Sequence, residues 1–273
     1  MRVALADERP IVLALVLGVS IWCSYILIGG CSMARAQQMA PVDTVLVVSV
    51  DVSNSVDDRR YKLQMEGIAE ALEDPGVMNE ILNGPRGGIL FSLVVWSDRP
   101  QVALPWIRVA NKAQAKALAA RVRALPRYGG QFTCMGRMMR FLNDKVLAQI
   151  PASTFRTVVD ISGDGKGNCN PEESIPSVRD ELVGYGTTIN GLPILEGDEA
   201  ETLEAWYRKN VRGGPAGFIL PAHGFEDFGR ALRQKFIVEI SMVPLDKLER
   251  KGSGPRSQVK RITQLRRGAS PVR

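Results

Sequence analysis

Residues 44–50 read Thr-Val-Leu-Val-Val-Ser-Val, and Asp51-Val52-Ser53-Asn54-Ser55 follows directly. The first run is rich in β-branched residues and almost wholly apolar, which is typical of a parallel strand covered on both faces. Asp51, Ser53 and Ser55 therefore come at the carboxyl end of a buried strand, where open α/β sheets place their ligand sites. One carboxylate and two hydroxyls at alternating positions suit a hard divalent cation.

Strand and helix patterns alternate along the body of the chain. The run at 101–109 contains Pro105 and follows a short turn, so we expect it to be an antiparallel edge strand. The alternation predicts the α/β class, with a doubly wound, mostly parallel sheet and helices on both faces. The other expected strands lie near 88–96, 155–162, 187–195 and 217–220, and the helices near 57–73, 111–125, 134–149, 173–183, 198–211 and 225–238.

The first 36 residues are typical of a targeting segment. Residues 11–30 are apolar and uncharged, and Ala34-Arg35-Ala36 is an A-x-A cleavage signature, so we predict a signal peptide over residues 1–36. Two alternatives remain open. The run is long enough to span a bilayer as an uncleaved anchor, and the residues before Cys31 loosely resemble a bacterial lipobox. Each alternative predicts an exported body, in the periplasm or associated with the bacterial cell envelope.

Charge is unevenly distributed along the chain. The net charge is +6, but residues 245–273 hold nine Lys or Arg and two acidic residues, so this tail carries +7 and the rest −1. We expect no nucleic-acid binding by the nearly neutral body. The tail is rich in Gly, Ser, Pro and Arg, which predicts disorder. Contact with a membrane is expected only through this tail or an N-terminal anchor.

Two further loops carry oxygen-bearing side chains. Thr133 comes after Gly129-Gly130 and before an expected helix, and Asp164 follows the expected strand at 155–162. Side chains at three strand ends can meet if the strands are neighbours in the sheet. Two carboxylates balance the charge of one Mg²⁺, Mn²⁺ or Ca²⁺, and such an ion keeps a position open for a partner's carboxylate.

These motifs resemble the metal-ion-dependent adhesion site of von Willebrand factor A-type domains. The order of the motifs fits, as do their spacings of about 80 and about 30 residues, and the resemblance covers residues 41–243. It looks closest to a bacterial branch of exported domains. One departure is that Gln131 and Phe132 separate the glycine pair from Thr133, where the family has Gly-Gly-Thr. The resemblance implies one divalent cation, Mg²⁺ first and Mn²⁺ or Ca²⁺ as alternatives, at Asp51, Ser53, Ser55, Thr133 and Asp164.

Each of these residues also has an interpretation without a metal. Ser55 and Asp58 resemble a helix N-cap pair, and Thr133 is a candidate N-cap of its own helix. Asp51 and Asp164 are candidate turn residues. Their joint placement at three strand ends favours a common site over four separate structural roles.

The cysteines agree with export. Cys134 and Cys169 lie outside the targeting segment, and an exported domain with two cysteines is a candidate for one disulfide. Cys134 follows Thr133 directly, and Cys169 comes five residues after Asp164. We therefore predict a disulfide that ties the second and third loops together. A single histidine, His223, and the lack of C-x-x-C argue against zinc or haem sites.

The predicted function is an exported, cation-dependent binding or adhesion module, not an enzyme, that engages an acidic group on a protein or glycan partner. One alternative is a metal-dependent hydrolase, in which Asp160 or Asp98 would serve as the general base. A second is a degenerate domain whose site residues act only as caps and which serves envelope assembly through its surface. The lone His223 argues against a Ser-His-Asp triad.

Overall fold

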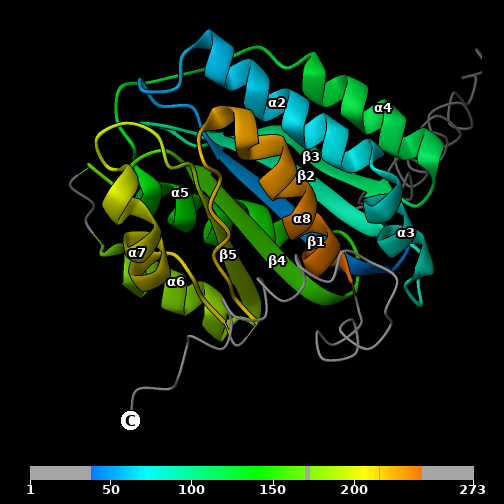
Figure 1. The fold of residues 1–273 in the computed structure, drawn as a ribbon. Coiled ribbons are helices and arrows are strands. Elements are labelled where there is room, and N and C mark those ends of the chain that lie inside the picture. The colour runs from blue at the N-terminus through cyan, green and yellow to red at the C-terminus, as the bar shows by residue number, and fades with distance from the viewer. Residues whose placement is uncertain (1–37, 170–172, 215, 242–273) are drawn as a thin grey trace, which may run out of the picture. The chain divides into compact units, whose positions relative to one another are not determined.

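The structure is a computed structural model and describes residues 38–169, 173–214 and 216–241. A five-stranded sheet lies at its centre, in the order β3-β2-β1-β4-β5 (Figure 1). β1 pairs in parallel with β2 and β4, and β4 with β5, while β3 runs antiparallel at the edge as predicted. The strands are β1 (Val42–Asp51), β2 (Ile89–Trp96), β3 (Gln101–Val109), β4 (Thr154–Gly163) and β5 (Thr187–Pro193).

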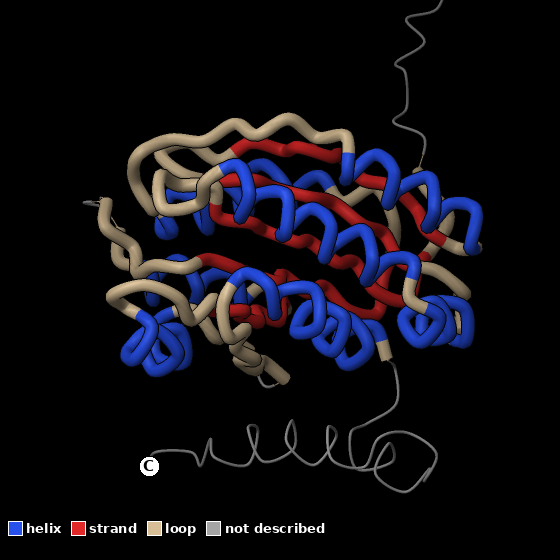
Figure 2. The backbone as a smooth tube through the Cα atoms, turned by 45° about the horizontal axis from the view of Figure 1, so that its top comes forward, coloured by secondary structure: helices blue, strands red, loops and turns tan. Residues whose placement is uncertain are grey.

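Helices cover both faces of the sheet (Figure 2), which confirms the doubly wound α/β class. Successive strand residues point to opposite faces. Leu46 and Val48 of β1 therefore join the core under the first group of helices, and Val47 joins the core under the second. The first group is α2 (Asp58–Glu73), α3 (Pro75–Asn83), α4 (Lys112–Arg123) and α8 (Phe228–Ile240), and the second is α5 (Met135–Phe141), α6 (Ile175–Gly184) and α7 (Ala200–Asn210).

The strand order reverses beside β1. The chain leaves β1 through α2 and α3 to reach β2 on one side, and later returns as β4 on the other side. Ligands of open α/β sheets bind outside the carboxyl ends of the strands at such a reversal. Here these ends are Asp51 of β1 and Gly163 of β4, which places the loop of Asp51–Ser55 beside that of Asp164.

α2 ends at Glu73, as expected of the helix near 57–73, and a further helix that was not expected, α3, begins at Pro75. The N–H of Asp74 bonds to the Ala71 carbonyl at the end of α2, and its carboxylate accepts hydrogen bonds from Gly76 and Val77 at the start of α3. Pro75 suits the first position of a helix, where its missing N–H is not needed. Asp74-Pro75 therefore marks both the end of α2 and the start of α3.

Two other expected elements also differ. The helix expected at 134–149 is α-helical only to Phe141, and then continues as a π-helix (Leu142–Val146) and a short 3-10 turn. The strand expected at 217–220 is reduced to a single bridge between Ile219 and Gly191. Its ladder is interrupted because the N–H of Phe218 donates to the side chain of Asn190 instead of to a strand carbonyl.

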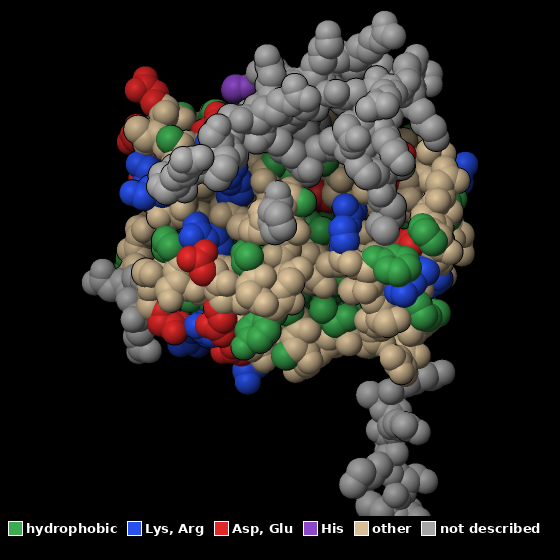
Figure 3. Space-filling model, turned by 90° about the horizontal axis from the view of Figure 1, so that it is seen from below, with side chains coloured by type: hydrophobic (Ala, Val, Ile, Leu, Met, Phe, Trp, Pro, Cys, Tyr) green, Lys and Arg blue, Asp and Glu red, His purple; other side chains and the backbone are tan. Residues whose placement is uncertain are grey.

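The predicted signal peptide at 1–36 and the predicted disordered tail at 245–273 lie outside the described residues. Within the described ranges, no helix has the length and apolar character needed to cross a membrane. On the face shown in Figure 3, acidic and basic side chains are interspersed, with apolar side chains between them.

A buried ionic cluster joins α8 to the sheet. The Nζ atom of Lys235 lies 3.3 Å from Asp160 Oδ1 and 3.1 Å from Glu239 Oε1, and Asn190 donates to the same Glu239 oxygen at 2.8 Å. All four side chains are buried. Burial, and then the charge of Glu239, raise the pKa of Asp160 to about 8. Two carboxylates thus share one ammonium, and the cluster favours holding a proton because an excess buried charge is costly.

This cluster predicts that stability depends on pH. Folded Asp160 keeps its proton up to a pH of about 8, whereas an unfolded one releases it near 3.8, so the free energy of unfolding falls as pH rises through this window. In Asp160→Asn the decline should be shallower, by up to about 1.4 kcal/mol per pH unit. Urea unfolding of both proteins in EDTA between these pH values measures the difference, and identical slopes would contradict the assignment.

Candidate metal centre

The first loop of the site follows β1 directly. Asp51 is fully buried, and its Oδ1 accepts a hydrogen bond of 2.8 Å from the N–H of Ser53. The Oγ atoms of Ser53 and Ser55 lie 3.3 Å apart. The N–H of Val56 donates to the carbonyl of Ser53 and closes the turn. Local hydrogen bonding therefore gathers three oxygen-bearing side chains at the end of β1.

The second loop, residues 129–133, places Thr133 next to the first loop, residues 51–55. Thr133 Oγ1 donates to Ser53 Oγ across 3.3 Å, although the two residues are 80 positions apart in the chain. Thr133 was considered as the N-cap of its helix, but the cap position of α5 is Cys134, with no side-chain cap bond. The insertion of Gln131 and Phe132 therefore does not prevent Thr133 from reaching the other side chains.

The third loop brings Asp164, whose Oδ1 accepts a hydrogen bond of 2.8 Å from Ser55 Oγ. The interpretation of Ser55 as a helix cap is thus wrong, because Asp57 caps α2 by accepting from the N–H of Arg60. The structure therefore brings all five predicted side chains together. Asp51 accepts from the backbone N–H of Ser53, and the side chains of Thr133, Ser53, Ser55 and Asp164 are linked to one another in that order.

Neither Asp51 nor Asp164 forms an ion pair with a basic side chain among the described residues. Burial raises the pKa of Asp51 to about 7, and the negative charge of Asp164 adds to the rise. The hydrogen bond from Ser53 has the opposite effect and lowers this pKa. Burial also raises the pKa of Asp164, opposed by the Ser55 hydrogen bond and by the charge of Arg60. Asp51 Oδ2 is buried and has no hydrogen-bond partner among the described residues.

These residues fit a hard divalent cation. Such ions take carboxylate, hydroxyl and water oxygens, and a buried carboxylate oxygen without a partner is a natural ligand. Gly163 lets the end of β4 pass close to this oxygen, because a Cβ there would lie 3.0 Å from Asp51 Oδ2 and 2.9 Å from the hydroxyl of Tyr207. The described part of the chain holds no group of three or more His, Cys, Asp or Glu suited to a metal, and three of the five side chains here are hydroxyl-bearing instead.

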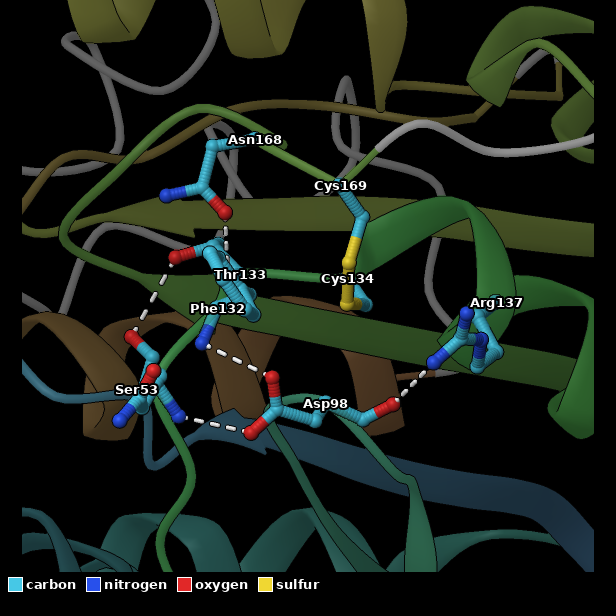
Figure 4. The surroundings of a disulfide bond; sticks show 9 residues. Ser53, Asp98, Phe132, Thr133, Cys134, Arg137, Asn168 and Cys169 are labelled. Atoms are coloured by element: carbon cyan, nitrogen blue, oxygen red, sulfur yellow. Dashed lines mark hydrogen bonds between the residues drawn. A yellow bond between two sulfur atoms is a disulfide. The ribbon is translucent and has the colours of Figure 1, made fainter.

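Two residues that position the second loop were missed from the sequence (Figure 4). The carboxylate of Asp98 accepts hydrogen bonds from the N–H groups of Gln131 at 2.7 Å and Phe132 at 3.1 Å. Asn168 Oδ1 accepts from the N–H of Thr133 at 2.7 Å, and the Asn168 N–H donates back to the Thr133 carbonyl at 3.1 Å. Asp98, named above only as a possible general base, therefore holds Gln131 and Phe132 in place.

A disulfide joins Cys134 and Cys169, as the sequence predicted. Their Cα atoms are 5.0 Å apart, which is within the usual range for a disulfide. Figure 4 shows the bond beside the contact of Thr133 with Asn168. The second and third loops are thus joined covalently as well as by the two hydrogen bonds to Thr133.

A family model described as "Protein of unknown function (DUF1194)" matches residues 41–244. The chain belongs to this family. A search of curated proteins gave no match for the sequence. The DUF1194 region coincides almost completely with the described α/β body, and the five side chains of the site all lie within it.

Solved structures with the same fold include von Willebrand factor A-type domains. Proximal thread matrix protein 1 from the mussel byssus has a TM-score of 0.55 at 15% identity, over 72% of this chain and 46% of that one. One structure of that protein has a zinc-occupied MIDAS motif, the abbreviation for metal-ion-dependent adhesion site. The von Willebrand factor type A protein from Catenulispora acidiphila has a TM-score of 0.53 at 18% identity, over 72% and 43%.

The pilus adhesin SpaC from Lactobacillus rhamnosus GG is also similar, with a TM-score of 0.52 at 15% identity, over 74% of this chain and 31% of the adhesin. The chain thus spans less than half the length of these structures. At such identities the similarity establishes the fold, and this DUF1194 chain therefore has the von Willebrand factor A-type fold that its motifs predicted.

Replacing both cysteines, Cys134→Ser with Cys169→Ser, should lower the free energy of unfolding by about 2–4 kcal/mol, because the unfolded chain gains the freedom of the opened loop. Urea unfolding without reductant measures the loss. Peptide mapping of the unreduced wild-type protein should recover a cross-linked peptide that contains both residues. Recovery of Cys134 and Cys169 only as free thiols would contradict the assignment.

Proposed function

We propose that this chain is an exported binding module that holds one divalent cation at the site of Asp51 and Asp164, and through it engages a carboxylate on a partner. The observation that carries the proposal is that hydrogen bonds and close contacts link five oxygen-bearing residues at the end of β1, where the buried Asp51 Oδ2 has no hydrogen-bond partner among the described residues. A cation at this point would supply the charge that two buried carboxylates lack.

Each residue has a definite role in the proposed site. Asp51, Ser53, Ser55 and Thr133 would hold the ion directly or through water, and Asp164 would act through water and through its hydrogen bond with Ser55. The bound cation would supply an open position with net positive charge for an incoming carboxylate. Mg²⁺ is the proposed ion, with Mn²⁺ and Ca²⁺ as alternatives. The zinc-occupied motif of the mussel matrix protein supports a divalent cation in this fold.

A binding role is favoured over hydrolysis because both candidate general bases, Asp160 and Asp98, already contact other groups of the protein. Asp160 lies in the ionic cluster with Lys235 and Glu239, and both oxygens of Asp98 accept hydrogen bonds from the backbone of the second loop. The similarity in fold to a matrix protein and a pilus adhesin further supports a binding role, with an acidic group on a protein or glycan as the target.

Export is supported by the disulfide, because such bonds form and persist in oxidising compartments. The signal-like segment at 1–36 supports the same location in the periplasm or the cell envelope.

The sharpest test replaces Asp51 with asparagine, which keeps the shape and removes the charge. Wild-type protein should gain about 2.7 kcal/mol of stability at a Mg²⁺ concentration about 100 times its Kd, whereas Asp51→Asn should gain none. In EDTA the variant should unfold at an equal or higher urea concentration than wild type, because it no longer buries an uncompensated carboxylate.

Asp180→Asn is the matched control. It makes the same charge change at an exposed position on α6, where Asp180 pairs with its neighbour Arg179. The control should bind Mg²⁺ as wild type does in isothermal titration calorimetry. If Asp51→Asn binds Mg²⁺ as tightly as the control, or if Mg²⁺, Mn²⁺ and Ca²⁺ all leave the wild-type stability unchanged, the proposed function is wrong and the degenerate-domain alternative stands.

A further inference from the structure

Tyr207, near the end of α7, is fully buried, and its side chain crosses β5 to reach the end of β4. A Cβ added to Gly191 of β5 would lie 2.7 Å from the Tyr207 ring, and one added to Gly163 of β4 would lie 2.9 Å from its hydroxyl oxygen. A Cβ atom essentially never comes so close to another atom, so both strands need glycine where Tyr207 passes. Two strands therefore leave room for one tyrosine.

The hydroxyl of Tyr207 lies next to Asp51. Val50 of β1 pairs with Ser162 of β4, so Asp51 and Gly163 end neighbouring strands side by side. The added Cβ at Gly163 would also lie 3.0 Å from Asp51 Oδ2, so this oxygen and the Tyr207 hydroxyl are both close to one point. Burial raises the pKa of Tyr207 well above its usual range, and the negative charge of Asp51 is the next largest cause.

Neither of these two polar groups has a good hydrogen bond in this arrangement. The Tyr207 hydroxyl donates to the Gly163 carbonyl across 3.4 Å, whereas most O–H···O bonds measure about 2.5–3.0 Å. Asp51 Oδ2 has no hydrogen-bond partner among the described residues. A buried tyrosine usually finds a partner for its O–H, because burying a polar group without one is costly. A phenylalanine would fill the same space without that cost, so the hydroxyl itself needs an explanation.

We propose that Tyr207 is a positioning residue of the candidate metal centre, whose hydroxyl donates to Asp51 Oδ2 and holds this carboxylate in the orientation that a bound cation requires. The inference rests on the proposed function and extends it to a residue of α7, outside the three loops of the site. An ionised carboxylate is a stronger acceptor than a peptide carbonyl. The O–H therefore moves from the Gly163 carbonyl to Asp51 when a cation keeps that carboxylate ionised.

Tyr207→Phe tests the proposal, because it removes only the hydroxyl. Isothermal titration calorimetry with Mg²⁺ gives the Kd, and urea unfolding in EDTA gives the stability without an ion. Ultraviolet difference spectra, recorded before and after saturation with Mg²⁺, report changes at tyrosine hydroxyls. Tyr185→Phe is the matched control, since it removes the same atom at the end of α6, where Tyr185 is 76% exposed.

Tyr207→Phe should bind Mg²⁺ about tenfold or more weakly than wild type, because the loss of a group that orients a metal ligand lowers metal affinity by about 10–100-fold. Tyr185→Phe should stay within about twofold of wild type. Mg²⁺ should shift the tyrosine absorption of wild type and of the control, because one O–H gains a charged acceptor, and should leave that of Tyr207→Phe unchanged. In EDTA Tyr207→Phe should be at least as stable as wild type, because it no longer buries a weakly bonded hydroxyl.

The outcomes separate this inference from the proposed function. Equal Mg²⁺ affinity of Tyr207→Phe and Tyr185→Phe, or a wild-type tyrosine spectrum that bound Mg²⁺ does not change, would overturn the assignment of Tyr207. If Asp51→Asn still fails to bind Mg²⁺, that result leaves the proposed function standing. Lower stability of Tyr207→Phe in EDTA with unchanged Mg²⁺ affinity would show that Tyr207 only supports the fold. A wild-type protein that binds no divalent cation would instead overturn the proposed function, and this inference with it.

Discussion

Two carboxylates from different strands are buried in one small cluster at the end of the sheet, and the rest of the site depends on this arrangement. Asp51 closes β1 and Asp164 follows β4, and Ser53 and Ser55 bridge them by hydrogen bonds and a close contact. Burying two like charges is costly unless a cation or a proton compensates them. The arrangement therefore makes sense as a cation site, and Asp51 Oδ2 is the atom that most clearly lacks a ligand.

Holding such a cluster requires loops that do not spread apart. The disulfide of Cys134 with Cys169 joins two of the three loops, and Asn168 bonds to both backbone polar groups of Thr133. Asp98 fixes the two residues before Thr133 through their N–H groups. These supports lie around the oxygen cluster and order its side chains before any ion arrives, which lowers the ordering cost of binding.

The sheet and its edge strand followed from local signals in the sequence, because an apolar run with its flanking turn residues is a short stretch of chain. The five proposed ligands came from the resemblance of their motifs to a known type of site, and their binding of an ion stays a prediction. Contacts between distant residues did not follow in this way. Ser55 also fitted a helix N-cap in the sequence. No local pattern shows its actual bond with Asp164, because the two residues are 109 positions apart. The supporting roles of Asp98 and Asn168, and the burial of Asp160 against α8, depend likewise on tertiary packing, which no short motif encodes.

The central claim is that a divalent cation binds at the end of β1, and crystals of the protein grown with Mn²⁺ test it most directly. Anomalous diffraction should show one strong peak among Asp51, Ser53 and Ser55, with the coordinating oxygens at about 2–2.6 Å, the range expected for hard cations. A well-ordered crystal in which these side chains bond only to one another and to water, at saturating Mn²⁺, would contradict the account.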